Sequence, residues 1–204
     1  MKKVKLIIAD IELFTGKETE ILSQIAPYYV EKYKKYKIPE AAKQELVAGY
    51  LVKRFLGVDK DEQIVRGEYG KSSLVSGNTF FSLTHSGKYV SIAIADCEVG
   101  VDIEKLRPCH DATVKKIFSI RQKAELQELS GAEKDEQFTR IWTECEAILK
   151  YLGIGFGKAW DKDQGPLDIY SVETMKVGDY FLSCVTAEKA KIETRKLSVS
   201  RISF

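Results

Sequence analysis

The sequence predicts an α+β protein made of two similar, pseudo-symmetric α/β halves, each with an antiparallel sheet packed on a long helix and with the active site at their interface. Two long stretches have apolar residues at helical spacing, and shorter runs between them alternate like strands. A faint repeat relates GKYVSIAIA from Gly87 to GDYFLSCVT from Gly178. The halves are expected at residues 1–97 and 98–204.

The composition excludes several classes of protein. A chain of 204 residues with 44% hydrophobic residues can form one large core or two small ones, and a net charge of +2 does not suggest a nucleic-acid partner. Four cysteines without a CxxC pair and two histidines make no zinc-type ligand set, so we expect reduced thiols and a cytoplasmic protein. Lys5 and Asp10 interrupt the first apolar run, so it is interpreted as a strand and not as a signal peptide. No segment approaches the ~20 apolar residues that span a bilayer, and no membrane partner is expected.

The N-terminal half should begin with a strand and end its helical part with a long helix. Apolar runs predict a buried strand over residues 4–14 and a short helix over residues 19–25. The charged run YVEKYKKYK at residues 29–37 is typical of a solvated helix face, with a docking patch as the alternative. Pro39 and Gly57 then mark the start and end of an amphipathic helix whose apolar positions are Ala42, Leu46, Val47, Tyr50, Leu51 and Phe55.

The region before residue 98 is predicted to end in two paired strands. A polar, glycine-containing connection precedes residues 80–95, which alternate like two strands around a Ser86-Gly87-Lys88 turn. His85 lies just before that turn. It is either a structural histidine or, beside Thr84, Ser86 and Lys88, a group that contacts phosphate.

The segment VGVDIEKLRP, residues 99–108, is an unusual acidic strand. Alternation places Asp102 and Glu104 on one face and Val101 and Ile103 on the other. Two acids that face the same way repel each other unless positive charge lies between them. A solvated acidic edge strand is the alternative interpretation.

The C-terminal half should contain the clearest helix of the chain. Ser119 and Gln122 form a capping-box pattern, which predicts a helix from about Ile120. Residues 135–152 form the second long helix, whose buried stripe is Phe138, Ile141, Trp142, Cys145, Leu149 and Leu152. Glu146 and Lys150 share a neighbouring face, where a surface ion pair worth about 0.3 to 0.5 kcal/mol is the alternative to a functional pair. A glycine-rich exit and a loop over residues 158–167 should follow, and then strands over residues 169–172, 180–186 and 192–204.

Five short motifs appear in a characteristic order: EYGK at 68–71, FSLTHS at 81–86, GVDIE at 100–104, FS at 118–119 and WTECEAILK at 142–150. Together they resemble the two-domain, surfactin-type (Sfp-like) 4'-phosphopantetheinyl transferases, over about residues 40–157. The resemblance implies an enzyme, a holo-[carrier-protein] synthase. Such an enzyme moves the 4'-phosphopantetheine arm of coenzyme A onto a serine of an acyl or peptidyl carrier protein and releases 3',5'-ADP.

The resemblance also implies roles for the acidic residues and one lysine. Asp102, Glu104 and Glu146 would hold Mg²⁺ through oxygen ligands, as a pyrophosphate cleavage requires. Lys150 would stabilise the phosphates in the transition state. Either Glu146 or a metal-bound water would accept the proton of the carrier serine.

Further residues are implied in binding coenzyme A. They are Lys43 for the 3'-phosphate, Gly70 and Lys71 along the nucleotide, and Thr84 and His85 near the phosphates. The chain departs from the family pattern at three positions: Cys145 replaces a lysine, Ser72 replaces a proline, and Thr84 stands where serine is common.

Two other functions remain open at this point. Because Cys145 removes a positive charge, the chain could be a relative that binds coenzyme A with weak or no transfer. The same three acids could also serve a metal-dependent phosphohydrolase. Fatty-acid, polyketide and nonribosomal-peptide carriers all present a serine near an acidic helix, which Lys115 and Lys116 could meet. Two fused halves complete the cleft in one chain, so a monomer is expected.

Overall fold

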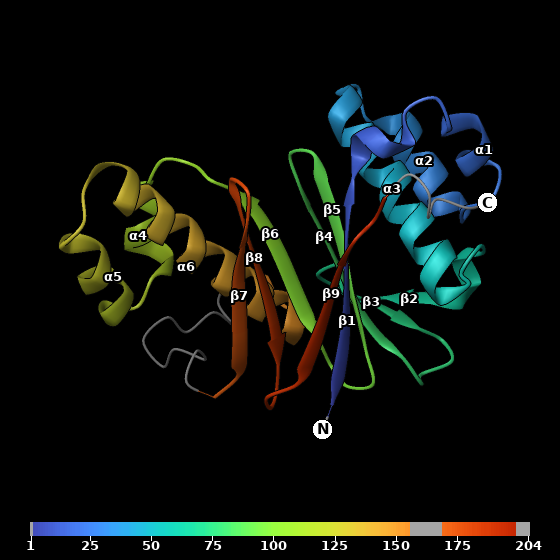
Figure 1. Ribbon diagram of the computed structural model, residues 1–204. Coiled ribbons are helices and arrows are strands. Elements are labelled where there is room, and N and C mark those ends of the chain that lie inside the picture. Colours follow the sequence, from blue (N-terminus) through green and yellow to red (C-terminus); the bar gives the residue numbers. More distant parts are fainter. Residues whose placement is uncertain (1, 156–168, 199–204) are drawn as a thin grey trace.

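The computed structural model describes residues 2–155 and 169–198 as an α+β fold (Figure 1). Helices α1, α2 and α3 cover one sheet, helices α4, α5 and α6 cover a second sheet, and the two sheets lie against each other between them (Figure 1). No helix within these residues is long and apolar enough to cross a membrane.

The elements of the N-terminal half follow in chain order. They are β1 (Lys3–Asp10), the 3-10 helix η1 (Ile11–Phe14), α1 (Glu18–Leu22), α2 (Pro27–Lys35), α3 (Pro39–Leu56), the 3-10 helix η2 (Asp61–Gln63), β2 (Ile64–Arg66), β3 (Ser72–Leu74), β4 (Phe80–Ser86) and β5 (Tyr89–Ala95).

The remaining elements belong to the C-terminal half of the sequence. They are β6 (Gly100–Lys105), α4 (Asp111–Ile117), α5 (Ile120–Gln127), α6 (Gly131–Leu152), β7 (Ser171–Val177), β8 (Tyr180–Thr186) and β9 (Lys191–Lys196).

Several predicted boundaries are confirmed because local chemistry sets them. Pro39 opens α3, and Gly57 closes it with a φ of 72°, in the left-handed region that favours glycine. Ser119 caps α5 through the expected reciprocal hydrogen bonds with Gln122. The paired strands around Gly87 and the strand at residues 180–186 also agree.

Other boundaries were wrong. The first strand ends at Asp10, whose carboxylate accepts a hydrogen bond from the Glu12 amide at 3.0 Å and starts the short helix η1. The polar connection before residue 80 contains β3, which pairs with β2 in a hairpin too short to show alternation. The first predicted tail strand lies later, at β7, and the helix predicted over residues 19–25 is α1. The loop predicted over residues 158–167 lies outside the described residues.

Hydrogen bonding defines two main sheets. One has the strand order β4-β5-β1-β9, and the other has the order β6-β8-β7. Strand β9 pairs with β1 in parallel, so a strand from the end of the chain completes the sheet of the N-terminal half. The remaining strand pairs in both sheets are antiparallel.

Alternation along β1 shows how the sheets share the core. Leu6 and Ile8 point into the layer between the sheets, where they pack with Val101 and Ile103 of β6. Ile7 points the other way, into the core beneath α1, α2 and α3. The acidic strand is therefore buried on its apolar face, as the alternation predicted.

Candidate active site at the seam between the two sheets

The seam between the two sheets is made by side chains of β4 and the backbone of β6. Three hydroxyl groups of β4 accept hydrogen bonds from three alternate amides of β6. The pairs are Val101 N with Ser82 Oγ at 3.1 Å, Ile103 N with Thr84 Oγ1 at 3.1 Å, and Lys105 N with Ser86 Oγ at 3.2 Å. We name these three hydroxyls the hydroxyl ladder. It fixes the acidic strand beside β4 although the two strands belong to different sheets.

Asp102 is a buried carboxylate with one satisfied oxygen. Its Oδ1 accepts hydrogen bonds from Thr84 Oγ1 at 2.9 Å and from Lys150 Nζ at 2.6 Å. Its Oδ2 is buried and has no hydrogen-bond partner within the described part of the chain. Burial raises the pKa of Asp102, and the Lys150 ammonium acts against this rise. The free oxygen is an acceptor that a cation would satisfy.

Glu104 is held at both oxygens. Ser86 Oγ donates to Oε2 at 3.1 Å, and Trp142 Nε1 donates to Oε1 at 3.1 Å. Partial burial and the negative charge of Asp102 raise its pKa. Because strand and helix both orient this carboxylate, it is preorganised toward the same space as Asp102.

Glu146 joins the two strand acids from α6. Burial, followed by the charge of Asp102, raises its pKa to about 7, and nearby Lys150 acts in the opposite direction. The close packing of α6 on β6 makes this meeting possible. A Cβ atom at Gly100 would lie 2.1 Å from the Ala147 carbonyl oxygen, so only glycine fits there. The structure thus brings together the three acids that the motifs selected.

The donor chemistry of these acids fits a hard divalent cation. The charge of Asp102 raises the pKa of Glu104, the charges of Asp102 and Glu104 raise that of Glu146, and Asp102 Oδ2 is buried with no hydrogen-bond partner among the described residues. In the described residues no three His, Cys, Asp or Glu side chains are already arranged as a metal-ligand group. Lys150 instead supplies the positive charge on Asp102.

Lys150 has a different partner from the one that helical spacing suggested. The expected surface ion pair was with Glu146, one turn away, but the ammonium binds the carboxylate of Asp102 across the α6–β6 contact. Because Asp102 is buried, this ion pair differs from an exposed pair on a helix surface, which contributes little to stability. It is the main counter-charge of the acidic group.

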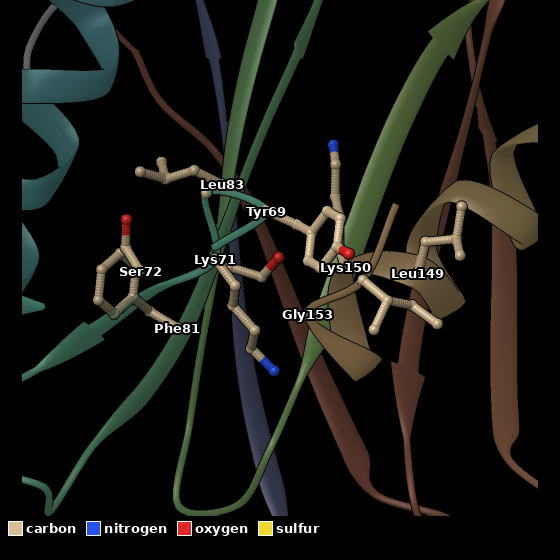
Figure 2. A pocket seen from close by; sticks show the side chains of 11 residues that line it. Tyr69, Lys71, Ser72, Phe81, Leu83, Leu149, Lys150 and Gly153 are labelled. Carbon is tan, nitrogen blue, oxygen red and sulfur yellow. The ribbon is translucent and has the colours of Figure 1, made fainter. Parts of the chain in front are cut away.

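A cavity of about 150 Å³ opens beside Lys150, between the two halves. Residues of the β2–β3 hairpin and β4 line one side and residues of α6 line the other, as Figure 2 shows. Gly70 and Lys71, which the motif assigns to the nucleotide of coenzyme A, lie in this lining. The Lys71 ammonium donates to Glu98 Oε2 at 2.5 Å and to the Tyr151 carbonyl oxygen.

The N-terminal half gathers two cations at the ring of Tyr28, outside the residues that line the cavity. Lys32 and Arg66 both lie against the ring of Tyr28, at 5.0 Å and 3.5 Å from its centroid. Two buried guanidinium nitrogens of Arg66, Nε and Nη2, have no hydrogen-bond partner among the described residues. Desolvation by the surrounding chain and, after it, the positive charges of Lys150 and Lys32 lower the pKa of the His85 imidazole to about 4. Adjacent cations with unsatisfied donors are an arrangement that favours an anionic ligand.

Sequence reasoning missed Lys32 and Arg66. Lys32 belongs to the charged run at residues 29–37, which was interpreted as a solvated face or docking patch. Its half-buried side chain pairs at 3.2 Å with Glu45, a buried residue of α3. Arg66 is in the short strand β2, which carries no periodic signal. The available signal was Glu45, because a glutamate at a core position of an amphipathic helix needs a cation such as Lys32 beside it.

Two residues predicted to bind coenzyme A already have other partners. Lys43 contacts Glu12 at 3.3 Å and Thr15 at 3.0 Å, and none of the three lines the cavity. Thr84 is buried, and its hydroxyl is already engaged by Asp102 and the Ile103 amide.

Cys145, the main departure from the family pattern, lies in the core. Its side chain is fully buried with Phe118 and Phe138, and Gln122 Nε2 donates to its sulfur at 3.8 Å. Burial raises the pKa of the thiol to about 12, so the sulfur is a neutral packing group. Position 145 therefore faces α5 and not the acidic group.

Known proteins resemble this chain over most of its length. The family model described as the 4'-phosphopantetheinyl transferase superfamily matches residues 98–199. The chain is 30% identical to the 4'-phosphopantetheinyl transferase Sfp of Bacillus subtilis (strain 168), over 86% of this chain and 78% of that protein. It is 26% identical to another 4'-phosphopantetheinyl transferase of Bacillus subtilis, over 83% and 75%. It is 32% identical to the 4'-phosphopantetheinyl transferase AcpT of Salmonella typhimurium, over 67% and 66%. The chain therefore belongs to the 4'-phosphopantetheinyl transferase superfamily, the family that its five motifs resemble.

Proposed function

We propose that this chain transfers the 4'-phosphopantetheine arm of coenzyme A to a serine hydroxyl of a carrier protein and releases 3',5'-ADP. The observation that best supports this function is the group of Asp102, Glu104, Glu146 and Lys150 beside a cavity between the halves. The names of the relatives point to the same reaction.

Asp102, Glu104 and Glu146 would hold a magnesium ion. Bound there, the ion would neutralise charge on the pyrophosphate of coenzyme A. The orphaned Oδ2 of Asp102 and the repulsion among the three acids support this assignment. It is a proposal about these side chains, and their oxygen chemistry is the reason for preferring magnesium.

Lys150 would contact the phosphates directly. It lines the cavity and carries a positive charge that now satisfies Asp102. Its ammonium would stabilise negative charge on the departing 3',5'-ADP.

Glu146 is our candidate for the base that accepts the proton of the carrier serine. In the metal-free chain, burial and the negative charge of Asp102 raise its pKa to about 7, so Glu146 holds a proton more readily than an ordinary glutamate. A water on the proposed ion is the other candidate base. The serine oxygen would then attack the β-phosphorus of coenzyme A, and the bond from that phosphorus to the 3',5'-ADP oxygen would break.

The cations of the N-terminal half would bind the phosphates of coenzyme A. His85, Lys32 and Arg66 form this group, and the two unpartnered nitrogens of Arg66 supply the strongest argument for it. Gly70 and Lys71 would lie along the nucleotide in the cavity. Lys43 stays a prediction for the 3'-phosphate, since its ammonium is engaged elsewhere.

The remaining expectations follow from the arrangement. Lys115 and Lys116 are exposed on α4 and suit the acidic helix of a carrier.

One chain supplies both sides of the site, which supports a monomer, and four free thiols suit the cytoplasm. Tyr89 and Tyr180, equivalent positions of the sequence repeat, contact each other at 4.9 Å, which supports the proposed pseudo-symmetric halves.

The test is a transfer assay with coenzyme A, MgCl₂ and a panel of apo carrier proteins, read by intact-protein mass. We expect a gain of one phosphopantetheine group and its loss in Asp102→Ala and Glu146→Ala. Folded protein that modifies no carrier would contradict the proposal. Tight coenzyme A binding without turnover would favour a binding relative, and 3',5'-ADP release without a carrier would favour a phosphohydrolase.

A further inference from the structure

The hydroxyl ladder does more than join two strands. The Ser86 hydroxyl accepts a hydrogen bond from the Lys105 amide at 3.2 Å and donates its proton to Glu104 Oε2 at 3.1 Å. The Thr84 hydroxyl does the same with the Ile103 amide and the carboxylate of Asp102. Each of these two hydroxyls thus accepts a hydrogen bond from one amide of β6 and donates to the carboxylate of the residue just before that amide.

Ser82 is a natural control in the same ladder. Its hydroxyl accepts from the Val101 amide at 3.1 Å, so it joins the strands as Ser86 does. The preceding residue of β6 is Gly100, which has no side chain to orient. Ser82 therefore shares the structural role of Ser86 but has no carboxylate beside it to hold.

We propose that Ser86 is a positioning residue that sets the affinity of the acidic group for a divalent cation by holding Glu104 in place. This inference rests on the proposed function, in which Glu104 is a metal ligand. Each carboxylate oxygen has two lone pairs. Ser86 and Trp142 occupy one on each oxygen of Glu104, which leaves the others for a cation.

The origin of Ser86 gives this role a wider consequence. Trp142 and Glu104 both come from the C-terminal half, but Ser86 is in β4 of the N-terminal half. The orientation of Glu104 thus depends on the contact between the two sheets. Metal affinity is coupled to the docking of the halves, and a chain whose seam opens would lose both together.

The experiment measures Mn²⁺ binding to the full chain by electron paramagnetic resonance, without coenzyme A. The variants are Ser86→Ala, Ser86→Thr, Ser82→Ala and Asp102→Ala. Loss of a hydrogen bond to a metal ligand typically weakens metal binding by about 10- to 100-fold, and we expect this for Ser86→Ala. Ser86→Thr keeps a hydroxyl and should restore the affinity. Ser82→Ala should lower the melting temperature about as much as Ser86→Ala while its Mn²⁺ affinity stays that of the unmodified chain.

The outcomes separate this inference from the function on which it rests. Equal Mn²⁺ affinity in Ser86→Ala and the unmodified chain, with affinity lost in Asp102→Ala, overturns the role of Ser86 alone. Equal losses in Ser82→Ala and Ser86→Ala also overturn it, because the ladder would then act only through stability. An unmodified chain that binds no Mn²⁺ overturns the metal site as well. If Ser86→Ala does not fold, Ser86→Cys replaces it, since a thiol is a weaker donor of similar size.

Discussion

The two halves of the molecule carry different clusters of charged side chains. The C-terminal half supplies Asp102, Glu104 and Glu146, whose pKa values are all raised. The N-terminal half supplies Lys32 and Arg66 at the ring of Tyr28. The acids lie on one strand and one long helix, whereas the cations come from a short helix and a hairpin. On the proposed function, the reacting groups therefore lie on one strand and the longest helix, and the coenzyme A-binding cations lie on shorter elements.

The strongest test of this division removes one acid. Asp102→Asn keeps the size of the side chain but removes its charge, so Lys150 loses its partner and a cation loses a ligand. Loss of groups that only orient a ligand costs about 10- to 100-fold, so loss of the ligand itself should cost more than about 100-fold in kcat. Steady-state transfer kinetics measure this. If Asp102→Asn only raised KM for coenzyme A and left kcat unchanged, Asp102 would belong with the binding residues and the comparison would fail.

A lysine at position 145 should not give the C-terminal half the cation that other family members have. Cys145 is fully buried against Phe118 and Phe138, so a lysine there would lack water and a partner. Cys145→Lys should destabilise the protein by about 3 kcal/mol and leave transfer unimproved. Thermal unfolding and the transfer assay check both points, with Cys145→Ala as the control for lost volume.

A gain in transfer by Cys145→Lys at unchanged melting temperature would contradict this prediction. It would mean that position 145 faces the phosphates, and that the chain is weakened by its cysteine.

Removing a cation should produce the opposite kinetic pattern from removing an acid. Arg66→Gln loses the two unpartnered nitrogens that we assign to phosphate. Charged hydrogen bonds are worth about 1.5 to 3 kcal/mol, so KM for coenzyme A should rise by about 10- to 100-fold with little change in kcat. Lys43→Gln is the matched comparison: Lys43 stays a prediction for the 3'-phosphate, and its contacts with Glu12 and Thr15 lead us to expect a smaller rise in KM.

A larger effect from Lys43→Gln than from Arg66→Gln would restore the assignment made from the motif. It would also require Lys43 to leave its present partners when coenzyme A binds.

The same contrast explains what could be predicted from the sequence. Asp102 and Glu104 share a strand face by alternation, and Glu146 shares a motif with Trp142, so these local patterns together with the family resemblance selected them. Lys32 and Arg66 converge only through the tertiary contact of α2 with the hairpin, which leaves no period or motif. The family model likewise matches residues 98–199 and not the N-terminal half.

The hydroxyl ladder shows a second limit. Ser82, Thr84 and Ser86 alternate along β4, but the sequence does not say which strand their hydroxyls will meet. The pairing with β6 depends on how the two sheets pack. For the same reason the partner of Lys150 was predicted on its own helix and found on the neighbouring strand.

The smallest expected effect is on the free energy of unfolding, and it follows from the burial of Glu146 and the negative charge of Asp102. Folding raises the pKa of Glu146 from its ordinary 4.5 to about 7, so the folded chain favours the protonated form. This contribution is complete below pH 4.5 and is lost as pH rises through about 7. The metal-free protein should therefore lose on the order of 2 kcal/mol of stability relative to Glu146→Gln as pH rises from 4.5 to above 7. Urea unfolding of both proteins in EDTA measures the difference.

A cation that neutralises the acids should oppose the loss, so added MgCl₂ should flatten the pH profile of the unmodified chain more than that of Glu146→Gln. Parallel profiles in EDTA would show that burial and Asp102 do not raise the pKa of Glu146 in the folded chain.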